Sequence, residues 1–353
     1  MALGARGIVG LDIGSSAVRG ALVASGRSGL SLQRFGQVPL PEDAVVDGEI
    51  RDEGLVSEAI AQLWKRAKFG TKRAVIGVAN QRVIVRQVDL PFLEEKDFRS
   101  SLRFQVADHI PMPVDDAELD FEVLEDFHTP NGDHMMKVLL VAAATEMVEA
   151  FVSSVSGGGV ETVGVDLTPF AVARAVSPVA RGETGIPGAQ AVVDVGAGVT
   201  NIVVHVGGEP RFVRILLVGG DDVTETLSNE LGVPTDEAEA IKMDLSVGAG
   251  SQQAEQIVNT RVRSLVEEIR GSIDYYSSQD ESQPVNSVLM TGGGSLVSEL
   301  VHRLEQTLRT EVRQAAPLSD MSISKSGLTQ EQAAQIEPVS AAAIGLAMGA
   351  VRS

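Results

Sequence analysis

Two aspartates lie in matching surroundings, half a chain apart. Asp12 stands in "VGLDIGSSAVRGALV" (residues 9–23), and Asp194 stands in "AVVDVGAGVTNIVVHV" (residues 191–206). In both stretches an apolar strand leads to the aspartate, and a glycine and small residues follow before a second apolar strand. Such a hairpin tip lets backbone N–H groups approach phosphate oxygens without obstruction, and a carboxylate beside it suits Mg²⁺ and its waters. The two hairpins together therefore predict a clamp for a phosphate chain and its magnesium ion.

Either aspartate alone could instead be a turn residue that binds nearby backbone N–H groups. The recurrence 182 positions later favours the clamp, and it indicates a duplicated domain. Both stretches run from strand to turn to strand, whereas a dinucleotide-binding fingerprint needs a helix after the turn. A G-x-x-x-x-G-K-[ST] phosphate loop is also missing from the sequence. The two common nucleotide-binding folds are therefore disfavoured.

The hydrophobic pattern predicts the elements that hold the first hairpin. Residues 7–38 predict three strands, residues 55–69 predict an amphipathic helix, and residues 72–79 predict a further strand. The expected order is thus a meander of three strands, a helix and another strand.

Residues 83 to about 160 have a different pattern. A strand ends at Pro91, and a helix follows with apolar residues at a four-residue spacing from Phe98 to Ile110. An acidic stretch then leads into a second apolar strand. We interpret this segment as an inserted αβ subdomain.

Composition limits the classes of partner. The length of 353 residues favours two domains, and the formal charge of −19 repels nucleic acid and anionic lipid. Cysteine is absent, which excludes disulfides and thiolate metal sites and is consistent with a reducing cytoplasm. No apolar stretch is long enough to span a bilayer. We therefore expect a cytoplasmic protein that binds no nucleic acid, does not insert into the membrane, and reaches any membrane through a partner.

Four stretches, in order, resemble the motifs of the actin-like ATPase superfamily. The two aspartate hairpins resemble its phosphate motifs, and "VLMTGGGSLVSEL" (residues 288–300) resembles its adenosine motif. The stretch "EPVSAAAIGLAMGA" (residues 337–350) resembles its second connecting motif, a small-residue helix that packs tightly at the hinge between domains. The resemblance implies a duplicated α/β fold of the actin-like, ribonuclease H-like ATPase type, in which two domains flank a nucleotide cleft. It also implies ATP and Mg²⁺ as ligands.

The resemblance assigns site residues as well. Asp12 and Asp194 are expected to hold Mg²⁺ and its waters beside the phosphates, as metal ligands and catalytic groups. Glu239 and Lys242 have the E-x-x-K spacing with which chaperone-type relatives grip ribose and adenine, although an ordinary ion pair on a helix surface is the alternative. Arg19 stands where many relatives have a lysine, which keeps positive charge near the phosphates. The residues expected to bind the nucleotide are Gly14, Ser15, Ser16, Arg19, Gly196, Gly198, Thr200, Asn201, Gly219, Gly220, Glu239, Lys242, Gly292, Gly293 and Gly294.

The superfamily pattern also predicts domain limits. Residues 83–159 are expected to form the inserted αβ subdomain of the first domain. Residues 186–337 are expected to form the second actin-like domain, in which about 233–262 make a small helical subdomain. The first actin-like domain is expected to combine residues 1–82, 160–185 and 338–353.

The inserted segment resembles the PilM family of type IV pilus assembly proteins. The resemblance rests on the Arg-x-x-x-Leu-Pro lead-in from Arg86 to Pro91, the amphipathic helix, and the Ile-Pro-x-Pro segment at residues 110–113 before an acidic run. It implies an ATP-binding scaffold that captures the N-terminal peptide of a PilN-like bitopic membrane protein, in a groove between the first domain and the subdomain. It implies recruitment by partners to the inner face of the cytoplasmic membrane. The pilus motor ATPase and a second copy of the chain are further candidate partners.

Charged residues of this segment are the candidates for the rim of that groove. Arg86, Arg99 and Arg103 are expected there, because charge normally lies on a solvated face. Leu102 and Val106 are expected instead in the core of the subdomain. An FtsA-like, filament-forming cell-division protein is an alternative, disfavoured because no basic amphipathic helix follows the hinge helix. A small-metabolite kinase of the same fold is a less favoured alternative, because no catalytic carboxylate facing a polyhydroxyl pocket is identifiable.

Hydrolysis of ATP requires a polar residue that positions the attacking water. In "DLTPFAVARA" (residues 166–175), which resembles the first connecting motif, Thr168 stands where relatives use a glutamate or glutamine. Threonine is a poor general base, and Asp166, two positions earlier, is a further candidate catalytic residue. We therefore expect tight Mg–ATP binding with slow or negligible hydrolysis.

Overall fold

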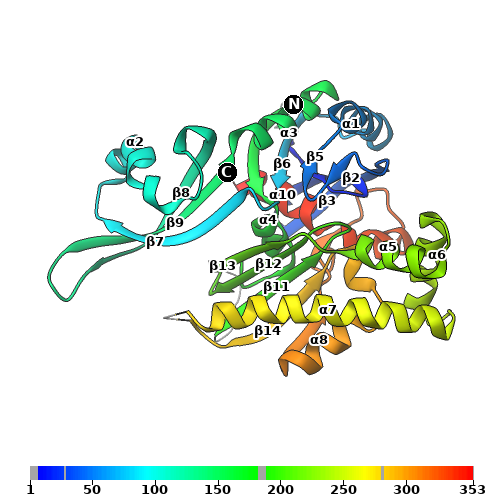
Figure 1. The fold of residues 1–353 in the computed structure, drawn as a ribbon. Coiled ribbons are helices and arrows are strands. Elements are labelled where there is room, and N and C mark those ends of the chain that lie inside the picture. The colour runs from blue at the N-terminus through cyan, green and yellow to red at the C-terminus, as the bar shows by residue number, and fades with distance from the viewer. Residues whose placement is uncertain (1–6, 28, 182–187, 280–281, 353) are drawn as a thin grey trace.

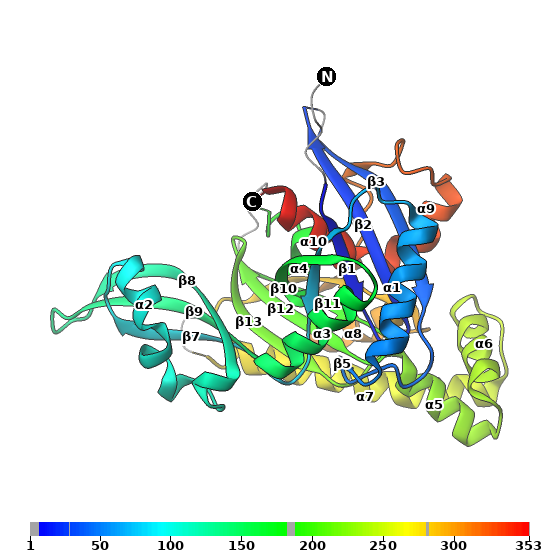
Figure 2. The same cartoon turned by 90° about the horizontal axis from the view of Figure 1, so that it is seen from above.

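The computed structural model describes residues 7–27, 29–181, 188–279 and 282–352 of the chain. Two mixed sheets form the centre of the protein, and a smaller three-stranded sheet projects to one side of them (Figures 1 and 2). Helices α5 and α6 lie at the opposite side (Figure 2). The two central sheets carry the aspartate hairpins.

The first sheet has the strand order β10-β6-β1-β2-β3-β16. Strands β1, β2 and β3 form an antiparallel meander, whereas β6 and β10 run parallel to β1. Antiparallel neighbours can be joined by a tight turn, so the polar residues from Gly14 to Ser16 form the tip of the β1–β2 hairpin. The bounds are β1 (Val9–Ile13), β2 (Ala17–Gly26), β3 (Gly29–Pro39), β6 (Arg73–Val78), β10 (Glu161–Leu167) and β16 (Met321–Ser322).

The second sheet repeats this path, with the order β13-β12-β11-β14-β15. Its first three strands again form an antiparallel meander, and β14 and β15 run parallel to β11. The duplicated α/β fold expected from the repeated motif is therefore confirmed. The bounds are β11 (Ala189–Val195), β12 (Thr200–Val206), β13 (Glu209–Leu216), β14 (Val285–Thr291) and β15 (Glu311–Gln314).

Helices cover the outer faces of both sheets and fill the space between them (Figure 1). Helices α1 and α3 contribute to the core of the first sheet, and α5, α6, α7 and α8 contribute to the core of the second. A further core combines residues of both sheets with α4 and α10. The bounds are α1 (Glu53–Ala67), α3 (Thr145–Gly157), α4 (Thr168–Val176), α5 (Gly220–Leu231), α6 (Thr235–Ser246), α7 (Gln252–Ser277), α8 (Leu300–Leu308), α9 (Gln330–Ile336) and α10 (Ala341–Arg352).

Helix α10 approaches its neighbours backbone to backbone. A Cβ atom on Gly345 would collide with the carbonyl oxygen of Ala171 in α4, and one on Gly10 in β1 would collide with the carbonyl oxygen of Ala343. Small side chains are therefore required on both sides of this contact. The expectation of a tightly packed small-residue helix is confirmed, whereas its role as a hinge between domains stays a prediction.

The third sheet has the order β7-β9-β8 and carries α2 on one face. Phe98, Leu102, Val106 and Ile110 are all buried in the core between them, as their four-residue spacing predicted. The bounds are β7 (Val83–Pro91), α2 (Glu95–Gln105), β8 (Ala117–His128) and β9 (His134–Ala144).

The domain limits expected from the sequence stay predictions. The third sheet ends with β9, and α3, which follows it, packs with α1 in the core of the first sheet. The expected limit between residues 185 and 186 lies outside the described residues. Among the helices of the described residues, none is by itself long and apolar enough to cross a membrane. The segment from α9 to Val339 and helix α10 together have the length and composition of a membrane span, but they are bent by 88° relative to each other.

Candidate functional site

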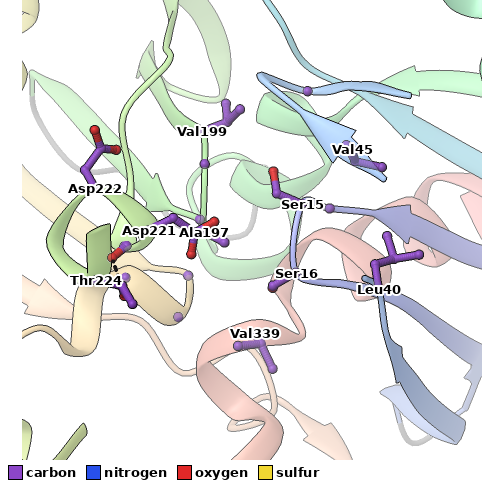
Figure 3. A pocket seen from close by; sticks show the side chains of 18 of the residues that line it. Ser15, Ser16, Leu40, Val45, Ala197, Val199, Asp221, Asp222, Thr224 and Val339 are labelled. Atoms are coloured by element: carbon purple, nitrogen blue, oxygen red, sulfur yellow. Dashed lines mark hydrogen bonds between the residues drawn. The ribbon is translucent and has the colours of Figure 1, made fainter. Parts of the chain in front are cut away.

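A cavity of about 1410 Å³ lies between the two central sheets, with the tips of both aspartate hairpins in its wall (Figure 3). This volume is ample for a nucleotide-sized ligand. The residues predicted from the sequence that line it are Asp12, Gly14, Ser15, Ser16, Arg19, Asp194, Gly196, Gly198, Asn201, Gly220, Glu239, Lys242, Gly292, Gly293 and Gly294.

The two hairpin tips have the same turn and face each other. The N–H of Gly14 donates to the carbonyl oxygen of Ala17 over 3.1 Å, and the N–H of Gly196 donates to that of Val199 over 2.9 Å. A Cβ atom on Gly198 would lie 2.9 Å from Ser15 Oγ, so the tips are nearly in contact. One tip from each half of the chain therefore lies on either side of the cleft, as a clamp for a phosphate chain requires.

Each aspartate faces a polar partner at the same register position of its hairpin. Asp12 pairs with Arg19 across β1 and β2, and Asp194 pairs with Asn201 across β11 and β12. Arg19 Nη1 lies 3.7 Å from Asp12 Oδ2, and Asn201 Nδ2 donates to Asp194 Oδ2 over 3.1 Å. The duplication therefore extends to the polar pairs, although their chemistry differs between the halves.

Burial makes both carboxylates reluctant to ionise. It raises the pKa of Asp12 above its usual value, against the opposing charge of Arg19. It raises the pKa of Asp194 to about 6, with a further increase from the charge of Asp12 and a partial decrease from the hydrogen bond of Asn201. Both carboxylates can therefore be ionised at the same time only when a nearby cation offsets their charge.

Two buried polar atoms beside the aspartates have no hydrogen-bond partner within the described residues. They are Asn201 Oδ1 and Arg19 Nε. A buried acceptor and a buried cationic donor left unpaired cost free energy, unless a ligand pairs with them. A phosphate oxygen suits the guanidinium of Arg19, and a magnesium ion with its waters suits the two carboxylates and the amide oxygen. The donor set therefore fits a polyphosphate with its divalent cation.

Glycines hold the second hairpin against the adenosine-like loop. Gly292 has φ +87°, and a Cβ atom there would collide with the carbonyl oxygen of Val195. A Cβ atom on Gly294 would lie 2.6 Å from Val195 Cγ1, and one on Gly219 would collide with the carbonyl oxygen of Ala197. The glycines thus let three backbone segments meet at the wall of the cleft.

Glu239 and Lys242 project from α6 into the same cleft. Lys242 Nζ lies 2.6 Å from Glu239 Oε2, and it donates to the carbonyl oxygen of Gly220 over 3.1 Å and to Thr224 Oγ1 over 2.7 Å. The Thr224 hydroxyl donates to Glu239 Oε2 over 2.6 Å. The pair is thus an ion pair that lines the cleft, and its expected contact with ribose and adenine stays a prediction.

The N-terminus of α5 is used internally. The N–H groups of Gly220 and Asp221 donate to the carbonyl oxygens of Gly196 and Ala197, and that of Gly219 donates to Asp222 Oδ2. These N–H groups anchor the second hairpin, and they are therefore not free for a phosphate. Burial raises the pKa of Asp221, against the charge of Lys242.

Some predicted residues do not line the cavity. Thr200 is fully buried and donates to the carbonyl oxygen of Val218, so it fixes the strand that follows the second tip. Gly219 packs against the backbone of Ala197 in the second tip and is not part of the lining. Asp166 accepts a hydrogen bond of 2.9 Å from Arg174 Nη1, and that arginine also donates to the carbonyl oxygen of Gly345. The structure therefore places Asp166 in an ion pair beside the hinge helix rather than with Asp12 and Asp194.

The three arginines of the subdomain lie on its surface. Arg86 donates to the carbonyl oxygen of His109, and Arg103 donates to that of Val114. Arg99 lies over the ring of Phe121, 4.8 Å from its centroid. Each guanidinium is thus partly held by its own subdomain.

One wall of the cleft carries no motif that could predict it from the sequence. Residues from Leu40 to Gly48, between β3 and β5 (Glu49–Ile50), contribute to it. Asp43 and Asp47 have φ of 63° and 55°, values that turn-forming residues adopt more easily than most. No motif marks this stretch, and its Pro-Glu-Asp and Asp-Gly steps indicate only turns. Thr224 and Val339 also line the cleft and were not among the predicted site residues, although Val339 lies within the predicted connecting motif at residues 337–350.

Comparison with known proteins gives consistent results. The model of the family described as "Type IV pilus assembly protein PilM" matches residues 10–351. A chain of the solved "PilM-PilN type IV pilus biogenesis complex" is similar with a TM-score of 0.85 and 25% identity, over 98% of both chains. MreB5 of Spiroplasma citri bound to AMPPNP is similar in fold, with a TM-score of 0.53 and 12% identity, over 88% of this chain and 92% of that one.

A curated relative is more distant. The cell division protein FtsA of Neisseria meningitidis serogroup B is 24% identical over 205 residues, which are 51% of this chain and 48% of that protein. The match thus spans about half the length of that relative.

Proposed function

The chain belongs to the PilM family of type IV pilus assembly proteins, and from that premise we propose that it is an ATP-binding scaffold that captures the N-terminal peptide of a PilN-like membrane protein. The similarity to a chain of a PilM–PilN complex, which covers 98% of both chains, carries this proposal. A peptide captured in this way would place the protein at the inner face of the cytoplasmic membrane without insertion. The pilus motor ATPase and a second copy of the chain are further proposed partners.

Mg–ATP is the proposed ligand of the cleft. The facing hairpin tips, the unpaired Arg19 Nε and the two carboxylates support this assignment. Asp12 and Asp194 would hold the divalent cation through its waters, and Arg19 would bind the phosphates. Bound there, the cation would neutralise the phosphate charge in a cleft whose charged lining residues are mainly carboxylates.

Slow or negligible hydrolysis is proposed for the same site. Thr168 lines the cleft and is 8% exposed, and its hydroxyl cannot serve as an efficient base. Asp166 forms an ion pair with Arg174 and is not among the residues that line the cleft. In this arrangement the bound nucleotide would hold the two domains together and would not be turned over rapidly.

The subdomain is the proposed receptor for the peptide. Arg86, Arg99 and Arg103 are its proposed rim, and Phe104, which is 84% exposed on α2, is an aromatic side chain available to a partner. Exposed aromatic and arginine side chains are typical of the residues that dominate binding energy at interfaces. An apolar peptide with charged ends would suit this combination.

The test is a titration of synthetic cytoplasmic N-terminal peptides, from single-span membrane proteins encoded beside this chain, against the ATP-loaded protein. One peptide is expected to bind, and Arg103→Glu is expected to weaken it about tenfold, a loss of about 1.4 kcal/mol. The matched control is Arg34→Glu, which changes an exposed arginine of β3 in the first sheet. Failure of every peptide to bind would contradict the scaffold role. Nucleotide-dependent polymers on anionic vesicles would instead support an FtsA-like role.

A further inference from the structure

Arg19 is the basic side chain closest in register to the two aspartates of the cleft. In the described lining of the cavity the basic side chains are Arg19 and Lys242. Lys242 is bound to Glu239, Thr224 and the carbonyl oxygen of Gly220. Arg19 is therefore the charge that offsets the aspartate pair when no ligand is present.

The contacts of Arg19 are long for a guanidinium. Its Nη1 lies 3.7 Å from Asp12 Oδ2, and its Nη2 donates to Ser16 Oγ over 3.4 Å. Fully formed arginine–carboxylate hydrogen bonds are about 2.7–2.9 Å. Its Nε is buried and has no partner within the described residues, and the side chain is only 15% exposed. Arg19 thus lies near Asp12 but still has hydrogen-bond donors that Asp12 does not use.

Geometry keeps Arg19 in this position. Its cross-strand pairing with Asp12 fixes the backbone, and its Nη1 lies 3.5 Å from the position of a Cβ atom on Gly14, so the guanidinium lies beside the hairpin tip. The other half of the chain has Asn201 at the equivalent register position, and an amide carries no charge. The counter-charge for both aspartates therefore comes from the first hairpin.

We propose that Arg19 is a built-in substitute for the divalent cation: it neutralises Asp12 in the nucleotide-free protein, and it turns to the phosphate chain when nucleotide and cation enter together. The inference rests on the proposed nucleotide site and concerns its regulation. With Arg19 in place, the group of Asp12, Asp194 and Arg19 carries one net negative charge when both carboxylates are ionised, and a bare divalent cation must displace or repel the guanidinium. The cation consequently binds well only as a complex with a polyphosphate.

Arginine suits this exchange because its donors point in several directions from one plane. One Nη group can contact a carboxylate while Nε or the other Nη group contacts a phosphate oxygen. The exchange then needs a change of side-chain partners rather than a rearrangement of the hairpin.

The test compares wild type, Arg19→Gln and Arg19→Lys, with Arg34→Gln as a control for loss of an exposed arginine. The first readout is binding of Mg²⁺ alone to the nucleotide-free proteins, by isothermal titration and by the shift of the thermal midpoint. Wild type, Arg19→Lys and Arg34→Gln are expected to bind Mg²⁺ weakly, whereas Arg19→Gln is expected to bind it at least about tenfold more tightly, or 1.4 kcal/mol. Equal Mg²⁺ affinity in wild type and Arg19→Gln would overturn the proposal.

The second readout is the binding of ATP with EDTA and of ATP with Mg²⁺. Arg19→Gln is expected to lose more affinity for metal-free ATP than for Mg–ATP, because the guanidinium is the remaining counter-charge when the cation is missing. An equal loss for both forms would also overturn the proposal. Should wild type bind neither form, the proposed nucleotide site fails, while the Mg²⁺ titration still decides whether Arg19 excludes the cation. Should Arg19→Gln not fold, a tenfold gain in Mg²⁺ affinity by Arg19→Lys would count against the proposal, because lysine keeps the charge.

Discussion

Asn201 Nδ2 donates a hydrogen bond to Asp194 Oδ2 over 3.1 Å, across the hairpin that brings the second aspartate to the cleft. The amide supplies one donor, which does not offset the burial of the carboxylate, and the pKa of Asp194 is raised to about 6. In the nucleotide-free protein the ionised carboxylate of Asp194 therefore lowers the free energy of unfolding at neutral pH. A bound cation would offset this cost.

Asp194→Asn is expected to stabilise the nucleotide-free protein at pH 7.5. Because the folded-state pKa is raised from 3.8 to about 6, the stability contributed by the protonated carboxyl is fully present below pH 3.8 and is lost as the pH rises through 6. The ionised group then costs on the order of 2–3 kcal/mol, which asparagine removes. Chemical denaturation at pH 4.5, 6 and 7.5 measures this, with the exposed Asp108→Asn as control. A variant less stable than wild type at pH 7.5 would contradict the assignment.

Binding of Mg–ATP is expected to depend on pH through the same carboxyl. A divalent cation needs ionised carboxylates, so it must displace the proton from Asp194 below pH 6. The affinity is then expected to fall roughly tenfold per pH unit below 6, with proton release on binding. Calorimetry in two buffers of different ionisation enthalpy measures the released protons. Asp194→Asn is the control for titration of the nucleotide itself, and a pH dependence identical in both proteins would exclude this carboxyl.

Glycine substitutions in two helices should have opposite effects on stability. Gly345→Ala in α10 pushes a methyl group into the carbonyl oxygen of Ala171, and we expect the free energy of unfolding to fall by about 1–3 kcal/mol or more. Gly271→Ala in α7 meets no atom within 4 Å, and we expect it to be stabilising by up to about 1 kcal/mol. Urea titration of both variants gives the comparison. A neutral Gly345→Ala would show that α10 does not pack as tightly as described.

Substitutions of two phenylalanines of α2 should differ strongly in their effect on stability. Phe98 is fully buried in the subdomain core, so Phe98→Ala is expected to cost about 3–5 kcal/mol. Phe104 is 84% exposed, so Phe104→Ala is expected to change stability by less than about 0.5 kcal/mol while weakening the captured peptide. Hydrogen exchange of β9 amides reports the local stability. Equal effects on exchange would place both rings in the core.

The sequence predicted those parts of the protein that local pattern determines. Both aspartate hairpins, the apolar spacing of α2 and the small residues of α10 follow from alternation, period and residue size, and the resemblance to PilM-family proteins is confirmed by the family match over residues 10–351. Helix α3 was not predicted, because its apolar residues Met147, Phe151 and Val155 follow directly on a buried strand and obscure its start.

Other features depend on contacts between distant residues. The ion pair of Asp166 with Arg174 and the use of the Gly220 N–H by the carbonyl oxygen of Gly196 are set by how α4 and α5 pack against their neighbours. The wall formed by Leu40 to Gly48 is a turn-rich connection that becomes part of the cleft only when the two sheets face each other. No local pattern carries that information.

The cleft between Asp12 and Asp194 is proposed to hold ATP with its divalent cation. Isothermal titration of ATP with Mg²⁺ into nucleotide-free protein tests it most directly. We expect one site per chain with a Kd of about 1 μM or tighter, and turnover slower than about 1 per second in the same sample. A folded protein that releases no heat and gains no thermal stability with Mg–ATP would contradict it.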